Sequence, residues 1–205
     1  MENGMRILCY GDSNTFGHDP RSMIDSRYPR EVRWPGRLAI MGCTVDNLGL
    51  NGREIPATEA EIEAAIAQLC AHLPQDRVLI MLGTNDILKG TALRAEDAAA
   101  RMERFLRRLL PALEGTPLLL IAPPPMARGV WVRQPELITE SARLGACYAP
   151  MAQALGVDFA DAGKWDIPLI VDGVHFTAEG HARFAKGVAE ALGLPMDDES
   201  AVTEL

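Results

Sequence analysis

The sequence predicts an α/β fold in which a mostly parallel sheet of five strands is covered by helices on both faces. Five short runs rich in Val, Ile and Leu lie along the chain, each bounded by turn-forming residues, as is typical of buried strands. The segments between them repeat apolar residues with the period of a helix. Strands that alternate with helices pair in parallel through right-handed crossovers, and a sheet that is apolar on both sides needs a helical layer on each.

The five expected strands each lead into a turn that starts with Gly, Pro or Asp. Ligand sites of parallel sheets lie beyond the carboxyl ends of the strands, so we expect the functional residues in these turns. The strands are predicted at residues 5–10, 43–48, 77–82, 117–122 and 157–160.

Four helices are expected around these strands. Thr58 and Glu61 have the spacing of a capping box, Pro135 suits the first turn of a third helix, and Thr177 caps a fourth that runs to about Leu192. In the second helix, arginines occupy the polar positions between the apolar ones. The apolar stripes of the first two helices are Ile62, Ala65, Ile66, Leu69, Cys70 and Leu73, and Ala98, Met102, Phe105, Leu106, Leu109, Leu110 and Leu113.

Length and composition predict one domain. A chain of 205 residues that is 48% hydrophobic can bury a substantial core, and no repeat or linker divides it. We expect the domain over residues 1–195 and a solvated acidic tail over residues 196–205.

Charge and cysteine usage exclude several classes of partner. A net charge of −8 and a pI near 5.0 oppose binding to nucleic acid phosphates. Neither a signal peptide nor an uncharged apolar segment of membrane-spanning length is present, so no membrane partner is expected. The four cysteines lie far apart without a Cys-x-x-Cys pair, which predicts reduced, mostly buried thiols and a cytoplasmic location.

Polar side chains follow three of the strands. Ser13 stands in a glycine-containing turn after the first strand, and Asn85 follows the third, where its amide could donate to a developing oxyanion. The second strand leads to Gly49 and Gly52, which allow a backbone N–H to approach a ligand. Taken alone, each of these residues is more typical of a cap or a turn.

Asp172 and His175 lie three residues apart in the loop that precedes the last helix. A lone His at a helix start is usually a structural hydrogen-bonder. This spacing also lets the carboxylate accept the ring N–H and leave the other ring nitrogen free as a base.

Taken together, these blocks resemble the GDSL-type, or SGNH, hydrolase family, and most closely its bacterial arylesterase and acyltransferase branch. The resemblance extends from the first strand to the last helix, and the flanking segments Val32-Arg33-Trp34 and Pro123-Pro124-Pro125 add to it. The blocks that carry it are Gly11-Asp12-Ser13, Gly52, Gly83-Thr84-Asn85-Asp86 and Asp172-x-x-His175.

The resemblance implies a flavodoxin-like three-layer α/β/α sandwich and a serine esterase that needs neither a metal nor an organic cofactor. Ser13 would be the nucleophile, with His175 and Asp172 completing a triad. The backbone N–H groups of Ser13 and Gly52 and the amide of Asn85 would form the oxyanion hole, with Gly49 as the other glycine to consider. The substrates would be short-chain aryl, alkyl or carbohydrate acetyl esters. The resemblance leaves open acyl transfer, perhydrolysis and a homo-oligomer.

The loop after the fourth strand is stiffened by three prolines and lies at the edge of the crevice. Met126, Val130 and Trp131 are its candidate acyl-pocket walls, which would suit acyl groups from acetyl to butyryl. The alternative for Trp131 is packing on the protein's own surface or in a subunit contact.

Two other functions fit parts of the pattern. A flavodoxin-like protein could hold a phosphate or a flavin at the turn around Ser13. A metal-dependent hydrolase could use Asp172, His175 and His181, although His181 is more simply a polar-face residue of the last helix.

Overall fold

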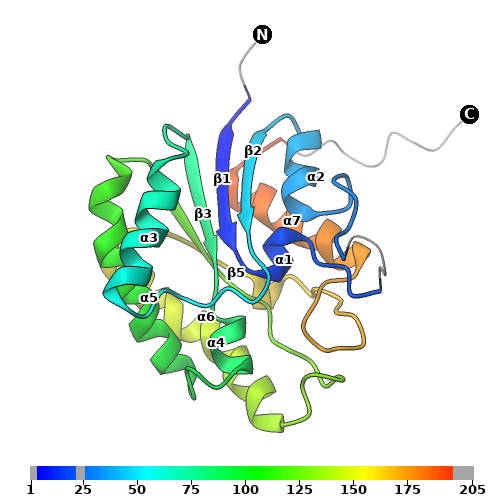
Figure 1. Ribbon diagram of the computed structural model, residues 1–205. Helices are drawn as coiled ribbons and strands as arrows, with labels where there is room; N and C mark the ends of the chain where they lie inside the picture. Colours follow the sequence, from blue (N-terminus) through cyan, green and yellow to red (C-terminus); the bar gives the residue numbers. More distant parts are fainter. Residues whose placement is uncertain (1–3, 22–25, 196–205) are drawn as a thin grey trace, which may run out of the picture.

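The computed structural model describes residues 4–21 and 26–195 and contains a five-stranded parallel sheet. The sheet order is β2-β1-β3-β4-β5, and each strand lies within one residue of its predicted bounds (Figure 1). The expected tail at 196–205 lies outside the described residues. The strands are β1 (Arg6–Gly11), β2 (Thr44–Gly49), β3 (Arg77–Met81), β4 (Leu118–Ala122) and β5 (Asp158–Asp161).

The helices include the four that the sequence predicts. Thr58 and Glu61 form the expected capping box, Pro135 begins a helix, and the Thr177 side chain caps the last one. Three short helices were not predicted, namely α1 (Ser13–Phe16), α2 (Trp34–Ile40) and α4 (Thr84–Leu88). The others are α3 (Glu59–Cys70), α5 (Ala95–Leu109), α6 (Pro135–Leu155) and α7 (Ala178–Leu192), with 3₁₀ turns at Leu110–Leu113 and Ala162–Lys164.

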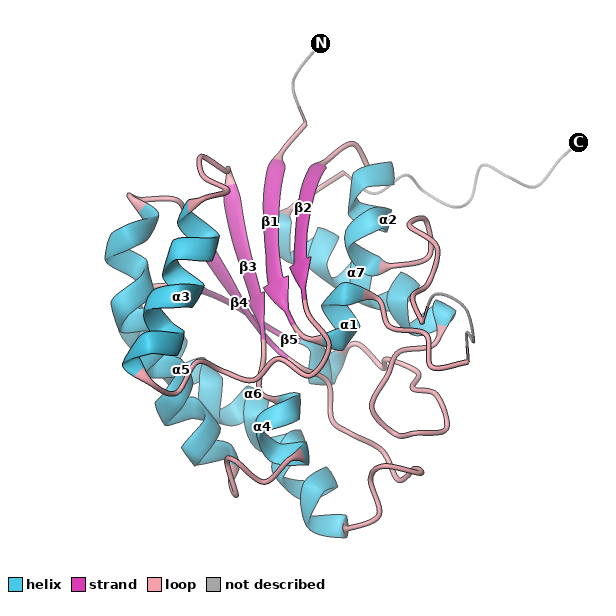
Figure 2. Ribbon diagram, viewed as in Figure 1, coloured by secondary structure: helices cyan, strands magenta, loops and turns pink. Residues whose placement is uncertain are grey.

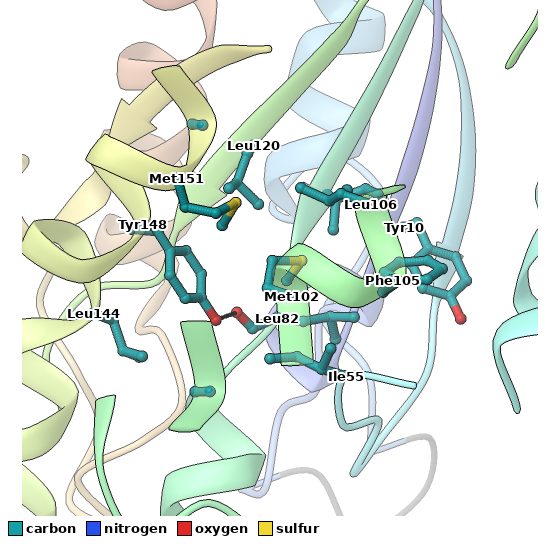
Figure 3. Close-up of a cluster of buried hydrophobic side chains, with 14 of the residues drawn as sticks. Tyr10, Ile55, Leu82, Met102, Phe105, Leu106, Leu120, Leu144, Tyr148 and Met151 are labelled. Carbon is teal, nitrogen blue, oxygen red and sulfur yellow. Dashed lines mark hydrogen bonds between the residues drawn. The ribbon is translucent and has the colours of Figure 1, made fainter. Parts of the chain in front are cut away.

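The helices form two layers around the sheet, as the predicted three-layer sandwich requires. Helices α3, α5 and α6 cover one face and α2 and α7 the other (Figure 1). Side chains alternate along each strand, so Leu8 and Tyr10 enter the first core and Ile7 and Cys9 the second. In the first core the buried Tyr148 hydroxyl donates to the carbonyl of Leu82 at 3.1 Å (Figure 3).

All five strands point the same way, so their carboxyl ends share one edge of the sheet (Figure 2). Helices α1 and α4 begin at this edge, directly after β1 and β3. Strands β1 and β3 are neighbours, with Gly11 paired to Met81. The turns that carry Ser13 and Asn85 therefore emerge side by side.

His181 corrects one expectation, because it is fully buried rather than on the polar face of α7. Its turn of α7 faces α2, where Nδ1 accepts the backbone N–H of Trp34 at 3.4 Å. The rings of Tyr28 and Phe176 pack edge-on against the imidazole, with centroids 5.1 and 5.3 Å away. Burial lowers the pKa of His181 to about 3, so the folded protein holds this ring neutral.

A buried neutral histidine makes stability depend on pH. Below the ordinary histidine pKa of 6.5, the unfolded chain binds a proton that folded His181 does not, so the free energy of unfolding falls as the pH falls. His181→Asn keeps an acceptor for Trp34 but cannot titrate. We expect the wild type to lose about 2 kcal/mol more than this variant between roughly pH 6.5 and pH 5, measured by urea unfolding. Parallel losses in both proteins would contradict this role of His181.

Candidate active site

Ser13 is the first residue of α1, at the turn that leaves β1. The Asp12 side chain caps this helix by accepting the backbone N–H of Asn14 at 2.9 Å. Ser13 is 5% exposed, and its hydroxyl lies at the carboxyl edge of the sheet. The strand, the tight turn and the cap together fix where this hydroxyl points.

Ser13, His175 and Asp172 form one continuous chain of hydrogen bonds. Nε2 of His175 lies 3.0 Å from the Ser13 hydroxyl, and Nδ1 lies 2.7 Å from Oδ2 of Asp172. Oδ1 of Asp172 accepts the backbone N–H groups of Val174 and His175 at 2.8 and 3.0 Å. Since a carboxylate only accepts, Nδ1 carries the ring proton, and Nε2 is free to accept from the hydroxyl.

Asn14, which was not predicted as a site residue, joins helix α1 to the loop that contains His175. Its amide donates to the carbonyl of Val174 at 3.1 Å and accepts the backbone N–H of Phe176 at 3.0 Å. These bonds span about 160 positions of sequence, so no local pattern announces them. They fasten the loop of His175 to the helix of Ser13.

Two aromatic rings flank His175 edge-on. The Trp131 ring lies 5.1 Å away and the His18 ring 4.7 Å away, measured between centroids. Nδ1 of His18 lies 2.9 Å from the carbonyl of Ser26. His18 was not predicted as a site residue, and its only signal in the sequence is its position five residues after Ser13.

Burial controls the charge states of this site. It lowers the pKa of His175, and the Asp172 carboxylate offsets only part of that effect. A neutral imidazole at neutral pH is the form that can take a proton from Ser13. Burial also raises the pKa of Asp12 to about 7 and that of Asp86 to about 6.

Helix α4 is fastened to the loop that follows β2. The Asn85 amide donates to the carbonyl of Arg53 at 3.0 Å, and the Asp86 carboxylate accepts the backbone N–H of Ile55 at 3.1 Å. The Lys89 ammonium reaches the carbonyl of Gly52 at 2.6 Å. Asn85 and Gly52 are both predicted oxyanion donors. The structure brings them together, because the Asn85 amide bonds to the residue that follows Gly52.

Gly49 and Gly52 have different surroundings. The Gly49 N–H already donates to Oδ1 of Asn47 at 2.8 Å, and a Cβ at Gly49 would lie 2.1 Å from the backbone nitrogen of Phe16. Gly52 has a φ of +72°, and its N–H has no hydrogen-bond partner within residues 4–21 and 26–195. Gly49 is thus needed for close packing, while Gly52 offers an open donor.

In the loop after β4, Met126 is 3% exposed and packs with the first core. Val130 and Trp131 are 58% and 51% exposed. The backbone N–H of Trp131 donates to the carbonyl of Asp172 at 3.1 Å, and its ring lies against that of His175. Trp131 therefore packs partly on the protein's own surface, beside the candidate active site.

The site geometry does not favour the two alternative functions. The Asp12 carboxylate occupies the amino end of α1, where a phosphate would have to bind. In the described part of the chain, no three His, Cys, Asp or Glu side chains are grouped as metal ligands, and His181 contacts Trp34 instead. Across residues 4–21 and 26–195, no helix is long and apolar enough to span a membrane.

Comparisons with known proteins identify the family of this chain. Residues 9–183 match the model of the GDSL-like lipase/acylhydrolase family. A putative arylesterase from Agrobacterium tumefaciens is 33% identical over 92% of this chain and 98% of its own, with a TM-score of 0.79. No match was found among curated protein sequences.

Two further solved structures are similar over nearly their whole length. An aryl esterase from M. smegmatis is 29% identical, covering 94% of this chain and 100% of its own, with a TM-score of 0.78. A carbohydrate acetylesterase from Sinorhizobium meliloti is 28% identical, covering 92% and 98%, with a TM-score of 0.79. These findings contradict the alternative of a flavin- or phosphate-binding protein without enzymatic activity. The chain belongs to the GDSL-like lipase/acylhydrolase family and is a carboxylic ester hydrolase.

Proposed function

We propose that this enzyme hydrolyses short-chain acyl esters through a Ser13–His175–Asp172 triad and an acyl-enzyme. The observation that carries the proposal is the hydrogen-bond chain from the Ser13 hydroxyl through both ring nitrogens of His175 to Asp172, at 3.0 and 2.7 Å. These are the distances that a nucleophile, its base and the group that orients the base require.

In the proposed cycle, His175 takes the hydroxyl proton as Ser13 attacks the ester carbonyl. Asp172 stabilises the imidazolium that forms, since its Oδ2 already accepts the Nδ1 proton. His175 then gives the proton to the departing alcohol or phenol, which leaves an acyl group on Ser13. A water molecule repeats the attack under the same base and releases the acid. An alcohol or a peroxide in place of water would give a new ester or a peracid.

The oxyanion of each tetrahedral intermediate would be held by the backbone N–H groups of Ser13 and Gly52 and by the Asn85 amide. The unpaired N–H of Gly52 supports its choice over Gly49, whose N–H is already bonded to Asn47. Asn85 uses one amide hydrogen for the Arg53 carbonyl and keeps the second for the substrate.

Short aryl, alkyl or carbohydrate acetyl esters are the proposed substrates. The proteins of similar structure include ones described as aryl esterases and as a carbohydrate acetylesterase. We also propose one domain over residues 1–195 and a cytoplasmic location, which four free cysteines support.

Ser13 should be the only residue that a fluorophosphonate labels, because within residues 4–21 and 26–195 only its hydroxyl bonds to Nε2 of His175. Peptide mapping by mass spectrometry should find one adduct, at Ser13, and Ser13→Ala should remove it. Ser141→Ala is the matched control, since Ser141 is also buried but hydrogen-bonds to the Ile138 carbonyl. Undiminished labelling of Ser13→Ala would overturn the assignment of Ser13 as the nucleophile.

Asp172→Asn should lower kcat by about 10⁴, because it disturbs the tautomer of His175.

Asn85→Ala should lower kcat by roughly 10² to 10³ with little change in KM, because an oxyanion donor acts mainly in the transition state. Steady-state kinetics on p-nitrophenyl acetate would measure both constants. The control is Gln75→Ala, which removes an amide from the opposite end of β3, where it bonds to the carbonyl of His72 at 2.7 Å. Equal kcat values for both variants would exclude Asn85 from the oxyanion hole.

The enzyme should prefer acetyl to butyryl esters over longer ones. Met126 lies in the core, so the remaining apolar side chains of the loop after β4 are the half-exposed Val130 and Trp131. Each further methylene contributes about 0.8 kcal/mol only where it can be buried. A p-nitrophenyl ester series should therefore show kcat/KM levelling off after butyrate. A steady rise to octanoate would contradict this view of the pocket.

A further inference from the structure

Arg53 is a partly buried cation in the loop after β2, the loop to which the Asn85 amide is hydrogen-bonded. Its guanidinium donates to the carbonyl of Gly11 at 3.1 Å, to the carbonyl of Leu48, and to Oε1 of Gln68 at 3.3 Å. The same group lies 4.0 Å from the centroid of the Tyr10 ring. Gly11 is the last residue of β1 and Leu48 the second to last of β2, so one side chain bonds to the carboxyl ends of two neighbouring strands.

The guanidinium of Arg53 bonds mainly to carbonyl groups of the main chain. No Asp or Glu of residues 4–21 and 26–195 forms an ion pair with it. Burial lowers the pKa of Arg53, while Tyr10 and Asp12 act in the opposite direction. Lys could not replace these contacts, since its single ammonium lacks the planar fork that reaches two carbonyls while stacking on a ring.

The main chain of Arg53 contacts the proposed catalytic machinery directly. Its carbonyl accepts the Asn85 amide at 3.0 Å, and it follows Gly52 in the chain. Fixing one amide hydrogen on this carbonyl fixes the direction of the second. A shift of the Arg53 backbone would therefore turn the Asn85 donor away from its line to the substrate.

The surface under the guanidinium is itself held rigidly. Tyr10 is 4% exposed and packs against the fully buried Phe105 of α5, with ring centroids 6.3 Å apart. Figure 3 shows both rings beside Ile55 at one edge of the core. The Arg53 side chain thus fixes the position of its loop relative to the sheet as well as relative to helix α4.

We infer that Arg53 is a positioning residue, whose guanidinium sets the Asn85 amide relative to Ser13. Gly11, one of its two carbonyl partners, stands two residues before Ser13. The same contact therefore fixes the loop of Arg53 relative to the strand that leads to Ser13. The inference rests on the proposed roles of Ser13 and Asn85.

A cavity of about 600 Å³ lies beside the guanidinium and gives a route for testing it. Tyr10, Arg53 and Arg101 line it, together with the exposed side chains of Glu61 and Gln68. Removing the Arg53 side chain would extend this cavity, so a small alkylguanidinium could enter and take its place over Tyr10.

The first experiment measures kcat and KM for Arg53→Ala and Arg53→Lys. We expect kcat to fall by roughly 10- to 100-fold with KM within about twofold, less than the whole loss from one oxyanion donor. Methylguanidinium below denaturing concentration should restore part of the kcat of Arg53→Ala. The control is Arg104→Ala, which removes an arginine that bonds the Ala57 carbonyl of the same loop at 2.8 Å and should leave kcat unchanged.

A double-mutant cycle with Asn85→Ala separates the inference from the proposed function. If Arg53 acts through Asn85, the double variant should be no slower than Asn85→Ala alone, and methylguanidinium should not rescue it. Additive losses, or an unchanged kcat in both Arg53 variants, would overturn the inference and leave the oxyanion role of Asn85 intact. A normal kcat for Asn85→Ala alone would instead refute the proposed oxyanion role of Asn85, on which the inference rests. If Arg53→Ala does not fold, Arg53→Lys carries the same cycle.

Discussion

The site depends on the closure of the loop at 172–176 onto helix α1. Helix α1 with Ser13 comes near the start of the chain and His175 comes near its end. Asn14 joins them through two backbone groups, at 3.1 and 3.0 Å. Because Asn14 fixes the two segments, Nε2 of His175 is held 3.0 Å from the Ser13 hydroxyl. A parallel sheet makes this closure feasible, because every strand releases its turn at the same edge.

The same edge contains buried polar groups whose bonds are mostly made by backbone. Asp172 accepts two backbone N–H groups besides the imidazole, Asp86 accepts that of Ile55, and Arg53 donates to two carbonyls. Backbone partners cannot change rotamer, so they hold charged groups more rigidly than exposed ion pairs do. The surface ion pairs of α5, such as Arg107 with Glu103, are exposed and contribute little by comparison.

Hydrophobic runs and caps were enough to predict the five strands, the four long helices and the three-layer arrangement. They worked because the central strands β1, β3 and β4 are buried on both faces, because the partly buried edge strands β2 and β5 end in turn-forming residues, and because each long helix carries a stripe or a cap. The short helices α1, α2 and α4 have too few residues to show a period. The contacts of Asn14 and Arg53, and the burial of His181 and Met126, come from pairs far apart in sequence. A pattern along one chain segment cannot contain that information.

The buried titratable groups of this protein act on stability in opposite directions over the same pH range. Asp12 and Asp86, with pKa values raised to about 7 and about 6, bind protons more readily when folded. Their contribution is present at low pH and is lost as the pH rises through those values. His181, with its pKa lowered to about 3, binds its proton less readily when folded, and His175 shifts in the same direction. Their contribution is present above the ordinary pKa of 6.5 and is lost as the pH falls. The two effects oppose each other between roughly pH 4 and pH 6.5, so the two carboxyl groups offset part of the stability that the two histidines lose on acidification.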